Sequence, residues 1–360
     1  MTSRAIHGGD IARAAQSIGV APGEILDFSA NVNPLGLPAR ARERLRRDLQ
    51  DEWLLSQYPD PDATELRTAL GERLHVPLEC MVVGAGADCL IHAAVRALAC
   101  ARCVIPVPAF AEYERAAGSR GCEVHRIPLA DAAHFKPEPR DLVVINNPHN
   151  PTGACLTQAE MRQRIAWIRA AGAVVLADEA FVDYVPDAAI TREAAAQDGI
   201  IAIRSLTKFF GCPGLRVGYA VASAKTARAV ATQLPAWPVT TPALNALAEA
   251  VRDAEYTCAT LEANLHARTA LVRQLAGLGC RIHPPAANFV FFEIPRGLES
   301  AAIRARLLRE HRILVRDCTS FEGIEPGRYL RVAVRRENEN QRLIDALAAV
   351  FDRNSCQPRT

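Results

Sequence analysis

Short apolar runs alternate with stretches of helical period between residues 80 and 220, and this alternation restricts the fold more than any other feature of the chain. Each run is continuously apolar, which is typical of strands that are covered on both faces. Strands separated by helices pair in parallel, so we expect an α/β fold with a mostly parallel sheet between layers of helices. Residues that follow the carboxyl ends of such strands gather at one edge of the sheet, where ligands bind. The predicted strands are Met81–Val83, Val104–Ile105, Leu142–Ile145, Val174–Leu176 and Ile201–Ile203, and the clearest predicted helices are Ala87–Leu98 and Gln158–Ala170.

The pattern changes after about residue 245, and 360 residues are more than one compact core needs. A long helical stretch is predicted over Pro242–Leu278, and a final helix over Glu337–Phe351. Between them lie the short predicted elements Phe289–Phe292, Ala301–Glu310, Ile313–Val315 and Tyr329–Val334. These elements predict a smaller α+β domain. We therefore expect an N-terminal segment at 1–35 that packs with the small domain, a large domain at 36–245, the small domain at 246–352 and a tail at 353–360.

Charge and hydropathy exclude several classes of partner. The formal net charge is only +2, and the basic run Arg40–Arg47 is interrupted by Glu43, so it indicates the solvated face of a helix. No window reaches the roughly 18 uninterrupted apolar residues of a membrane span, and the first residues lack the apolar stretch of a secretory signal. We expect a cytoplasmic protein that binds neither nucleic acid nor membrane.

The eleven cysteines show no regular framework, and an odd number of them fits a reducing compartment. Cys100 and Cys103 form a C-x-x-C motif, but no second pair follows at the spacing of a zinc site, which normally needs four ligands. We therefore expect no metal site.

Lys208 follows a predicted buried strand and precedes a loop rich in glycine and proline. The segment Ser205–Tyr219 reads S-L-T-K-F-F-G-C-P-G-L-R-V-G-Y. An amine in this position points into the crevice at the strand ends, where it can act covalently once it is activated. Ser205 by its hydroxyl and Arg216 by its charge can both bind a phosphate there. A lone Ser-x-x-Lys also occurs in β-lactamase-like enzymes, but the further motifs of those enzymes are absent.

Two other predicted strands end in polar residues. Asp178 ends the run V-V-L-A-D, where an ionised carboxylate is costly unless it is paired. A protonated ring nitrogen of a cofactor would be such a partner. Another strand leads into residues 146–153, which read N-N-P-H-N-P-T-G and include Asn150.

Three more positions have the residue types that a phosphorylated aromatic cofactor and an acidic substrate need. Residues 83–88 read V-G-A-G-A-D, and backbone amides at a helix N-terminus bind phosphate, although a plain tight turn explains the glycines about as well. Phe110 can stack on a flat ring or serve as a core aromatic residue. Arg331 lies among apolar residues, where a charged group usually has a partner, and a guanidinium can bind a carboxylate through two hydrogen bonds.

In this order, these motifs resemble the class I and II aminotransferase-like enzymes of fold type I, which use pyridoxal 5′-phosphate (PLP). The resemblance covers nearly the whole chain, and the segment around Lys208 is its most specific part. It implies that Lys208 carries PLP as a Schiff base, that Asp178 pairs with the pyridine nitrogen and that Phe110 stacks on the ring. The cofactor-binding residues that it implies are Ala85, Gly86, Ala87, Phe110, Asn150, Asp178, Ser205, Thr207, Lys208 and Arg216.

The N-terminal segment narrows the resemblance to one branch of this family. Residues 6–11 read I-H-G-G-D-I and residues 26–36 read L-D-F-S-A-N-V-N-P-L-G, which resembles the threonine-phosphate decarboxylases of cobalamin biosynthesis. Trp237 and Ile313–Cys318 also match, but the stretch after Trp237 is longer, which leaves the contacts there open. The alternative is a histidinol-phosphate aminotransferase, which generally lacks the H-G-G start and usually has tyrosine at the position of Phe181. We expect PLP-dependent decarboxylation of L-threonine O-3-phosphate.

The branch implies a set of substrate contacts. His7, Gly8, Asn31 and Arg316 would bind the substrate phosphate, Asn150 and Arg331 its carboxylate, and Tyr58 would reach in from the partner subunit of a homodimer. A phosphomonoester dianion is well bound by a guanidinium, an imidazole and backbone amides together.

Other interpretations of the same residues stay open. His7 could belong to a disordered tail, and Asp10 could simply cap a helix over Ile11–Ile18. A catalytically silent regulator usually carries a DNA-binding domain, whereas only about thirty residues precede the predicted fold here. Phosphothreonine and phosphoserine are not separated, because one methyl group discriminates by only about 1–3 kcal/mol.

Overall fold

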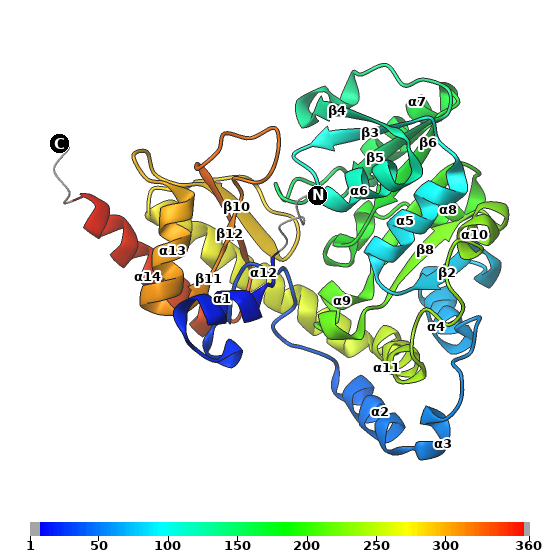
Figure 1. Cartoon of the computed structure of the whole chain (residues 1–360), viewed down its shortest axis with the longest axis horizontal. Coiled ribbons are helices and arrows are strands. Elements are labelled where there is room, and N and C mark those ends of the chain that lie inside the picture. Colours follow the sequence, from blue (N-terminus) through cyan, green and yellow to red (C-terminus); the bar gives the residue numbers. More distant parts are fainter. Residues whose placement is uncertain (1–7, 356–360) are drawn as a thin grey trace. The chain divides into compact units, whose positions relative to one another are not determined.

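The computed structural model describes residues 8–355, which divide into two compact units (Figure 1). The larger unit comprises residues 35–150 and 155–260, and the smaller unit comprises the remaining described residues. The division falls inside helix α12 (Ala254–Gly277), between Thr260 and Leu261. The sequence-based boundary after residue 245 would instead cut helix α11 (Thr241–Arg252).

The larger unit is built on a seven-stranded sheet with the strand order β2-β8-β7-β6-β5-β3-β4. Neighbouring strands are parallel except where β8 pairs with β2 and with β7. The strands are β2 (Met81–Gly84), β3 (Arg102–Val107), β4 (Glu123–Pro128), β5 (Asp141–Asn146), β6 (Val174–Asp178), β7 (Ile200–Ser205) and β8 (Gly218–Ala222). Each of the five strands predicted from an apolar run lies within one of these, so the α/β class with a mostly parallel sheet is confirmed.

Helices surround this sheet because their apolar sides pack against its buried strands. One core cluster joins Leu90 and Ile91 of α5, Tyr113 of α6 and Val230 of α10 to the strands. Thr157 and Glu160 cap α7 reciprocally, which fixes where that helix begins. The helices of this unit (Figure 1) are α2 (Ala39–Gln50), α3 (Glu52–Leu55), α4 (Thr64–Leu74), α5 (Ala87–Leu98), α6 (Ala111–Arg120), α7 (Gln158–Ala170), α8 (Thr191–Ala196), α9 (Leu206–Phe209), α10 (Ala224–Ala231), α11 and the start of α12.

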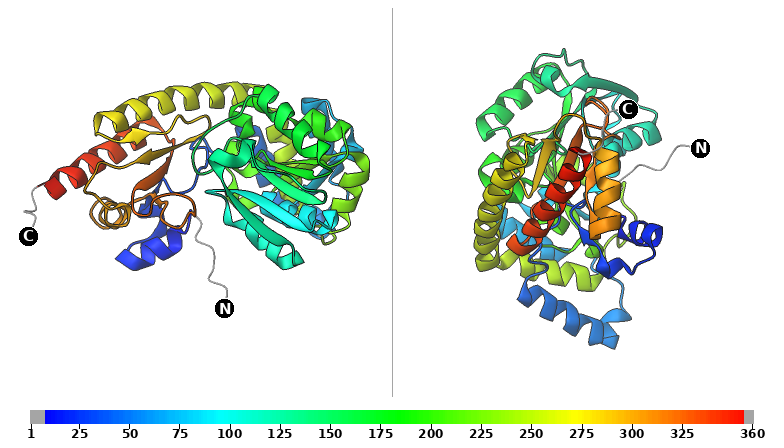
Figure 2. Two further views of the ribbon diagram at one scale, coloured as in Figure 1. Left: turned by 90° about the horizontal axis from the view of Figure 1, so that it is seen from above. Right: turned by 90° about the vertical axis from the view of Figure 1, so that its left-hand side faces the viewer.

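The smaller unit contains an antiparallel sheet with the order β12-β13-β10-β9 and a parallel pair of β1 with β11. Three helices, α12, α13 and α14, lie side by side in this unit (Figure 2), and their apolar residues share one core cluster with the sheet. Asp10 accepts a hydrogen bond from the backbone of Arg13, so it caps α1, which was one of the interpretations that the sequence left open. The elements are α1 (Ile11–Ile18), β1 (Leu26–Asp27), β9 (Arg281–Ile282), β10 (Phe289–Glu293), α13 (Ser300–His311), β11 (Ile313–Leu314), β12 (Arg316–Asp317), β13 (Tyr329–Ala333) and α14 (Glu337–Ser355).

Two helical predictions differ from the structure. The long helix predicted over Pro242–Leu278 is divided into α11 and α12 at Asp253. The Oδ1 atom of Asp253 accepts a hydrogen bond from the backbone N–H of Tyr256 at 2.9 Å, so a side chain that competes with the helical backbone starts a new helix. The final helix continues to Ser355, beyond the predicted start of the tail at residue 353.

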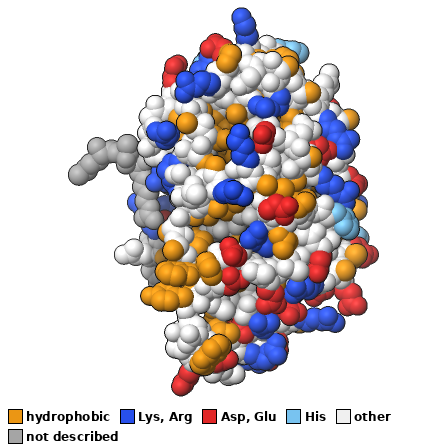
Figure 3. Space-filling model, turned by 90° about the vertical axis from the view of Figure 1, so that its right-hand side faces the viewer, with side chains coloured by type: hydrophobic (Ala, Val, Ile, Leu, Met, Phe, Trp, Pro, Cys, Tyr) orange, Lys and Arg blue, Asp and Glu red, His pale blue; other side chains and the backbone are white. Residues whose placement is uncertain are grey.

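Positive and negative side chains are interspersed on the face of the molecule that Figure 3 shows. Within α2, Arg44 of the basic run pairs with Asp48 at 2.9 Å. In the part of the chain from residue 8 to 355, no helix is both long and apolar enough to span a membrane.

Candidate active site

The polar residues singled out from the sequence lie at the carboxyl ends of neighbouring parallel strands in the larger unit. Asn146 at the end of β5 is the register partner of Asp178 at the end of β6. Asp178 is in turn the partner of Ile203 in β7, two residues before Ser205, and Lys208 follows on α9. The fold therefore brings these residues to one edge of the sheet, as expected for a ligand site in a parallel sheet.

Asp178 has the surroundings of a carboxylate that pairs with a cation. Its side chain is only 4% exposed, Oδ2 accepts a hydrogen bond from the hydroxyl of Tyr113, and Oδ1 accepts one from the backbone N–H of Ala180 at 2.9 Å. Burial raises the pKa of Asp178, whereas these hydrogen bonds and the charge of Lys208 oppose the rise. A cationic partner stabilises the ionised form of a buried carboxylate, and the protonated pyridine nitrogen of PLP is such a partner. The donor set at Asp178 thus fits the cofactor.

Tyr113 is a candidate functional residue that the sequence analysis missed. It is buried, and its ring meets the ring of Phe110 edge-on at a centroid distance of 5.7 Å. Burial and the charge of Asp178 raise the pKa of Tyr113 well above its ordinary value, so its hydroxyl stays protonated and donates. The available signal was spacing, because residues three apart at the start of a helix lie on the same face.

The glycine-rich turn before α5 lies against Arg216. Gly86 has a φ of +96°, and a Cβ atom there would be 2.7 Å from Nη2 of Arg216. A Cβ atom at Gly218 would be 2.7 Å from the backbone nitrogen of Ala87. Nη2 of Arg216 donates to Oδ1 of Asp88 at 2.9 Å, so the guanidinium lies beside the first turn of α5. A helix N-terminus next to a guanidinium suits a phosphate group.

Two hydroxyl groups lie on the neighbouring strand end. The side-chain oxygens of Ser205 and Thr207 are 2.8 Å apart, and both residues are buried. Ser205 is the register partner of Gly218, which pairs on its other side with Gly84 at the start of the turn. One corner of the larger unit therefore brings together the expected cofactor-binding residues Ala85, Gly86, Ala87, Ser205, Thr207 and Arg216.

Hydrogen bonds connect the loop after β5 to the end of β6. Nδ2 of Asn146 donates to the backbone oxygen of Asp178 at 3.0 Å, and Oδ1 of Asn146 accepts from the backbone N–H of Asn150 at 2.7 Å. His149 beside it is buried, and this burial lowers the pKa of His149 to about 4, although a hydrogen bond with the backbone of Pro108 opposes the shift. The loop thus holds Asn150 near Asp178 and includes a histidine that is neutral at pH 7.

In the smaller unit, two arginines lie side by side on one face of the antiparallel sheet. Arg316 in β12 is the register partner of Arg331 in β13, whose partner on the other side is Phe291 in β10. This face is opposite to the one that packs Leu330 and Val332 into the core, because successive strand residues alternate between faces. Arg316 is 8% and Arg331 6% exposed, and burial lowers the pKa of both, that of Arg331 to about 10. Adjacent buried like charges favour an anionic ligand.

Ser29 connects Arg331 to the N-terminal segment. Nη2 of Arg331 donates to the backbone oxygen of Ser29 at 2.8 Å, and the backbone N–H of Gly9 donates to its Oγ at 2.8 Å. A Cβ atom at Gly8 would be 2.1 Å from the backbone oxygen of Ser29, so only glycine fits there. Asn31 is buried, and its Oδ1 has no hydrogen-bond partner among residues 8–355. A buried polar atom in this state requires an explanation, for which a bound ligand is one candidate.

Two other residues that were expected to contact the substrate are Arg316 and His7. Nη2 of Arg316 donates to Oγ of Ser320 at 2.7 Å, and its guanidinium lies 5.0 Å from the ring centroid of Phe321. His7 lies outside the described residues, so its expected contact stays a prediction. Ser29 and Ser320 were missed by the sequence analysis, and no motif marked either of them.

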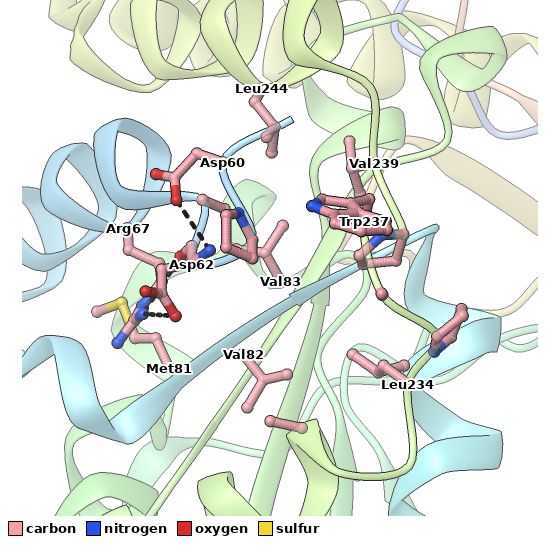
Figure 4. A pocket seen from close by; sticks show the side chains of 16 residues that line it. Asp60, Asp62, Arg67, Met81, Val82, Val83, Leu234, Trp237, Val239 and Leu244 are labelled. Atoms are coloured by element: carbon pink, nitrogen blue, oxygen red, sulfur yellow. Dashed lines mark hydrogen bonds and ion pairs between the residues drawn. The ribbon is translucent and has the colours of Figure 1, made fainter. Parts of the chain in front are cut away.

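Tyr58 is 78% exposed and stacks on Trp237 with their ring centroids 4.3 Å apart. Trp237 has a φ of +52°, which is uncommon for a bulky side chain, and it lines a cavity of about 360 Å³ in the larger unit (Figure 4). Asp60 and Arg67 also line this cavity, whereas none of the residues expected to hold the cofactor does. In the described part of the chain, no group of three or more histidine, cysteine or acidic side chains could hold a metal ion.

Comparison with known proteins places this chain in a family. The threonine-phosphate decarboxylase of Salmonella typhimurium is 34% identical to the chain, and the match covers 96% of each protein. The solved L-threonine-O-3-phosphate decarboxylase of Porphyromonas gingivalis is 25% identical, with a TM-score of 0.82 and coverage of 90% of this chain and 99% of that one. A histidinol-phosphate aminotransferase from Sinorhizobium meliloti in complex with pyridoxal-5′-phosphate has a TM-score of 0.83 at 23% identity, covers 98% of this chain and 96% of its own, and shows the same fold.

The family assignment follows from the extent of these matches. A model of the family described as aminotransferase class I and II matches residues 23–347. PLP is the cofactor of this family, and the buried carboxylate, the lysine and the phosphate corner described above fit it. On both sequence and fold, the chain belongs to the aminotransferase class I and II family.

Proposed function

We propose that this protein is a PLP-dependent decarboxylase that converts L-threonine O-3-phosphate into carbon dioxide and (R)-1-amino-2-propanol O-2-phosphate. The resemblance of its N-terminal segment places this step in adenosylcobalamin biosynthesis. The similarity over the full length to a threonine-phosphate decarboxylase supports this reaction over transamination.

The observation that carries the proposal is the pair of buried arginines in register, Arg316 and Arg331. Arg316 donates a hydrogen bond to the hydroxyl of Ser320, and Arg331 donates one to the backbone oxygen of Ser29. Two adjacent guanidiniums suit a substrate with two anionic groups. Phosphothreonine has both a phosphate and a carboxylate, so one substrate molecule could engage both guanidiniums.

The larger unit supplies the groups that would hold the cofactor. Asp178 would hold a proton at the pyridine nitrogen, Phe110 would lie against the ring, and Ser205, Thr207, Arg216 and the first amides of α5 would bind the phosphate. When bound, PLP supplies an electron sink for the pair released at the substrate α-carbon. Lys208 would hold the cofactor covalently in the resting enzyme. Once the substrate amine has displaced it, its free Nζ would deliver a proton to the α-carbon after carbon dioxide leaves.

Orientation of the substrate decides which bond breaks. We assign the carboxylate to Arg331 and Asn150, and the phosphate to His7, Gly8, Asn31 and Arg316. With the phosphate fixed, these residues would orient the bond between the α-carbon and the carboxylate for cleavage. Binding energy from the remote phosphate thereby contributes to the rate as well as to affinity.

Product analysis tests the reaction. The purified enzyme should release carbon dioxide from L-threonine O-3-phosphate without a keto acid, and unphosphorylated threonine should react poorly because it lacks the orienting phosphate. If histidinol phosphate and 2-oxoglutarate reacted efficiently while phosphothreonine gave no aminopropanol phosphate, the aminotransferase alternative would replace this proposal.

We also propose a cytoplasmic homodimer in which Tyr58 completes the site of the partner subunit. The exposed large hydrophobic residues support an interface, because most of them lie close together in sequence: Leu35, Leu49, Trp53, Leu55, Tyr58, Trp237 and Leu265. The ten cysteines of the described residues are all free thiols, which agrees with a reducing compartment. Sedimentation of an active enzyme at the mass of one chain would contradict the dimer.

A further inference from the structure

Two cysteines outside the site described above nearly touch. The Sγ atoms of Cys100 and Cys122 are 3.0 Å apart, and Sγ of Cys122 lies 3.2 Å from the backbone oxygen of Cys100. Both residues are free thiols, separated by 22 positions in the chain. A disulfide bond is about 2.05 Å long, so the sulfur atoms need to move by only about 1 Å to form one.

The backbone on both sides of this pair is held in place. Cys100 follows α5 and precedes β3, whereas Cys122 follows α6 and precedes β4. The two strands are parallel neighbours in which Arg102 is the register partner of Glu123, and the backbone N–H of Glu123 donates to the oxygen of Ala101 at 3.0 Å. The backbone N–H of Cys122 also donates to the oxygen of Ala117 at 3.0 Å. The sulfur contact therefore follows from strand pairing and not from one adaptable side chain.

The surroundings of the pair permit oxidation and make it slow. Cys100 is half-buried, so a small oxidant can reach it, while Cys122 and the nearby Cys103 are buried. Burial and then the hydrogen bond with Cys122 raise the pKa of Cys100 to about 12, and the positive charge of Arg120 opposes the rise only weakly. Because the thiolate is the reactive form, the raised pKa of Cys100 makes this oxidation slow.

We propose that Cys100 and Cys122 form a reversible intramolecular disulfide when the protein meets hydrogen peroxide. Peroxide first oxidises the Cys100 thiol to a sulfenic acid and releases one water molecule. The sulfur of Cys122 then attacks the Cys100 sulfur, the S–S bond forms, and the hydroxyl group with the Cys122 proton leaves as a second water molecule. Two thiols and one peroxide thus give one disulfide and two waters, and a dithiol reductant restores the thiols.

The bridge would join the ends of two helices that begin at the proposed cofactor site. α5 begins after Gly86, and α6 begins after Phe110, so both helices run from that site towards the cysteine pair. The two helices share a core cluster. A bond that closes the chain between Cys100 and Cys122 restricts the unfolded state and should raise thermal stability. The bridge depends only on the cysteine geometry, so it stands or falls separately from the proposed reaction.

Mass spectrometry of the peroxide-treated holoenzyme tests the bridge. After alkylation and digestion, the peptides with Cys100 and Cys122 should appear as one cross-linked species that is two hydrogens lighter, and dithiothreitol should separate them. The melting temperature should rise by about 5 °C on oxidation and return on reduction. Cys122→Ser should lose both effects. Cys258→Ser, which removes the exposed cysteine on α12, should keep both.

Three outcomes would overturn the proposal. One is oxidation of Cys258 while Cys100 and Cys122 both remain open to alkylation after unfolding. Another is a bridge from Cys100 to Cys103 in the parent protein. The third is a cross-link between two chains. Because mapping of the parent protein decides all three, the proposal stays testable even if Cys122→Ser does not fold.

Discussion

The two units differ in the signs of the charges that they bring together. In the larger unit, charges of opposite sign lie near one another: the charge of Lys208 opposes the rise in the pKa of Asp178, and Arg216 pairs with Asp88 at 2.9 Å. In the smaller unit, two charges of the same sign, those of Arg316 and Arg331, lie next to each other on paired strands. We propose that the first region holds the cofactor, with its cationic nitrogen and its phosphate, and that the second attracts the anionic substrate.

Two further charged residues near the ends of β6 and β7 are buried and have hydrogen-bond partners. Glu179 follows Asp178, is fully buried and accepts hydrogen bonds from the backbone of Ile190 and the hydroxyl of Thr191. Arg204 precedes Ser205, is 3% exposed and donates to Asp183 at 2.7 Å. Buried charges require such partners, since a buried charge that loses its partner costs about 3–5 kcal/mol. We infer that this ionic network stabilises the ends of β6 and β7, next to which Asp178 and Lys208 lie.

Replacing Lys208 should give the largest effect, because the proposal places it at the reacting atoms. Lys208→Ala should lower kcat by roughly 10²–10⁴-fold or more, the range of a lost proton-transfer group. Borohydride reduction followed by peptide mapping should find the pyridoxyl label on Lys208 in the parent protein and none in the variant. The exposed Lys225 is the matched control, and Lys225→Ala should keep both the label and the rate. A label on another lysine would refute the assignment.

Replacing the arginines should separate the roles of the two units. Arg316→Ala removes a charge-assisted contact worth about 1.5–3 kcal/mol, so KM for phosphothreonine should rise roughly tenfold to hundredfold. PLP should still bind, since its proposed contacts lie in the larger unit, and the cofactor absorbance reports this directly. Arg312→Ala, which removes an exposed arginine of the same unit that pairs with Glu24, should leave KM unchanged. Equal loss of cofactor and substrate binding in Arg316→Ala would remove the distinction between the units.

The same comparison explains how much the sequence could predict. The proposed cofactor-binding residues belong to short motifs at or next to strand ends, so local patterns were enough to select Asp178, Lys208 and Arg216 as candidates. The arginine face depends on the register of β12 with β13 and on Ser29, which lies about three hundred positions from Arg331 in the chain. No local pattern reveals such pairing, and here the family resemblance alone identified Arg316.

Secondary structure shows the same limit. Strand β4, at the edge of the large sheet, reads E-V-H-R-I-P and is mostly exposed, so no continuous apolar run marked it. The break at Asp253 was missed because the residues on both sides keep a helical composition. Strand pairing at an edge and a capping side chain are decided by tertiary contacts and by single hydrogen bonds, which composition averages out.

The smallest expected effect is a loss of folding stability at acidic pH, which we attribute to His149 in the larger unit. His149 is buried next to Asn150, and burial lowers its pKa to about 4, whereas an unfolded histidine titrates near 6.5. Between these two values the unfolded chain binds more protons, so stability is fully present above about pH 6.5 and falls as the pH drops towards 4. The loss between pH 7 and pH 5 should be about 2 kcal/mol, measured as a shift of the urea midpoint.

His149→Gln should flatten this dependence of stability on pH, while His266→Gln, at an exposed position, should not. Arg331, whose pKa is about 10, stays charged throughout this range, so acid should not change its charge. An unchanged slope in His149→Gln would show that the acid sensitivity has another source.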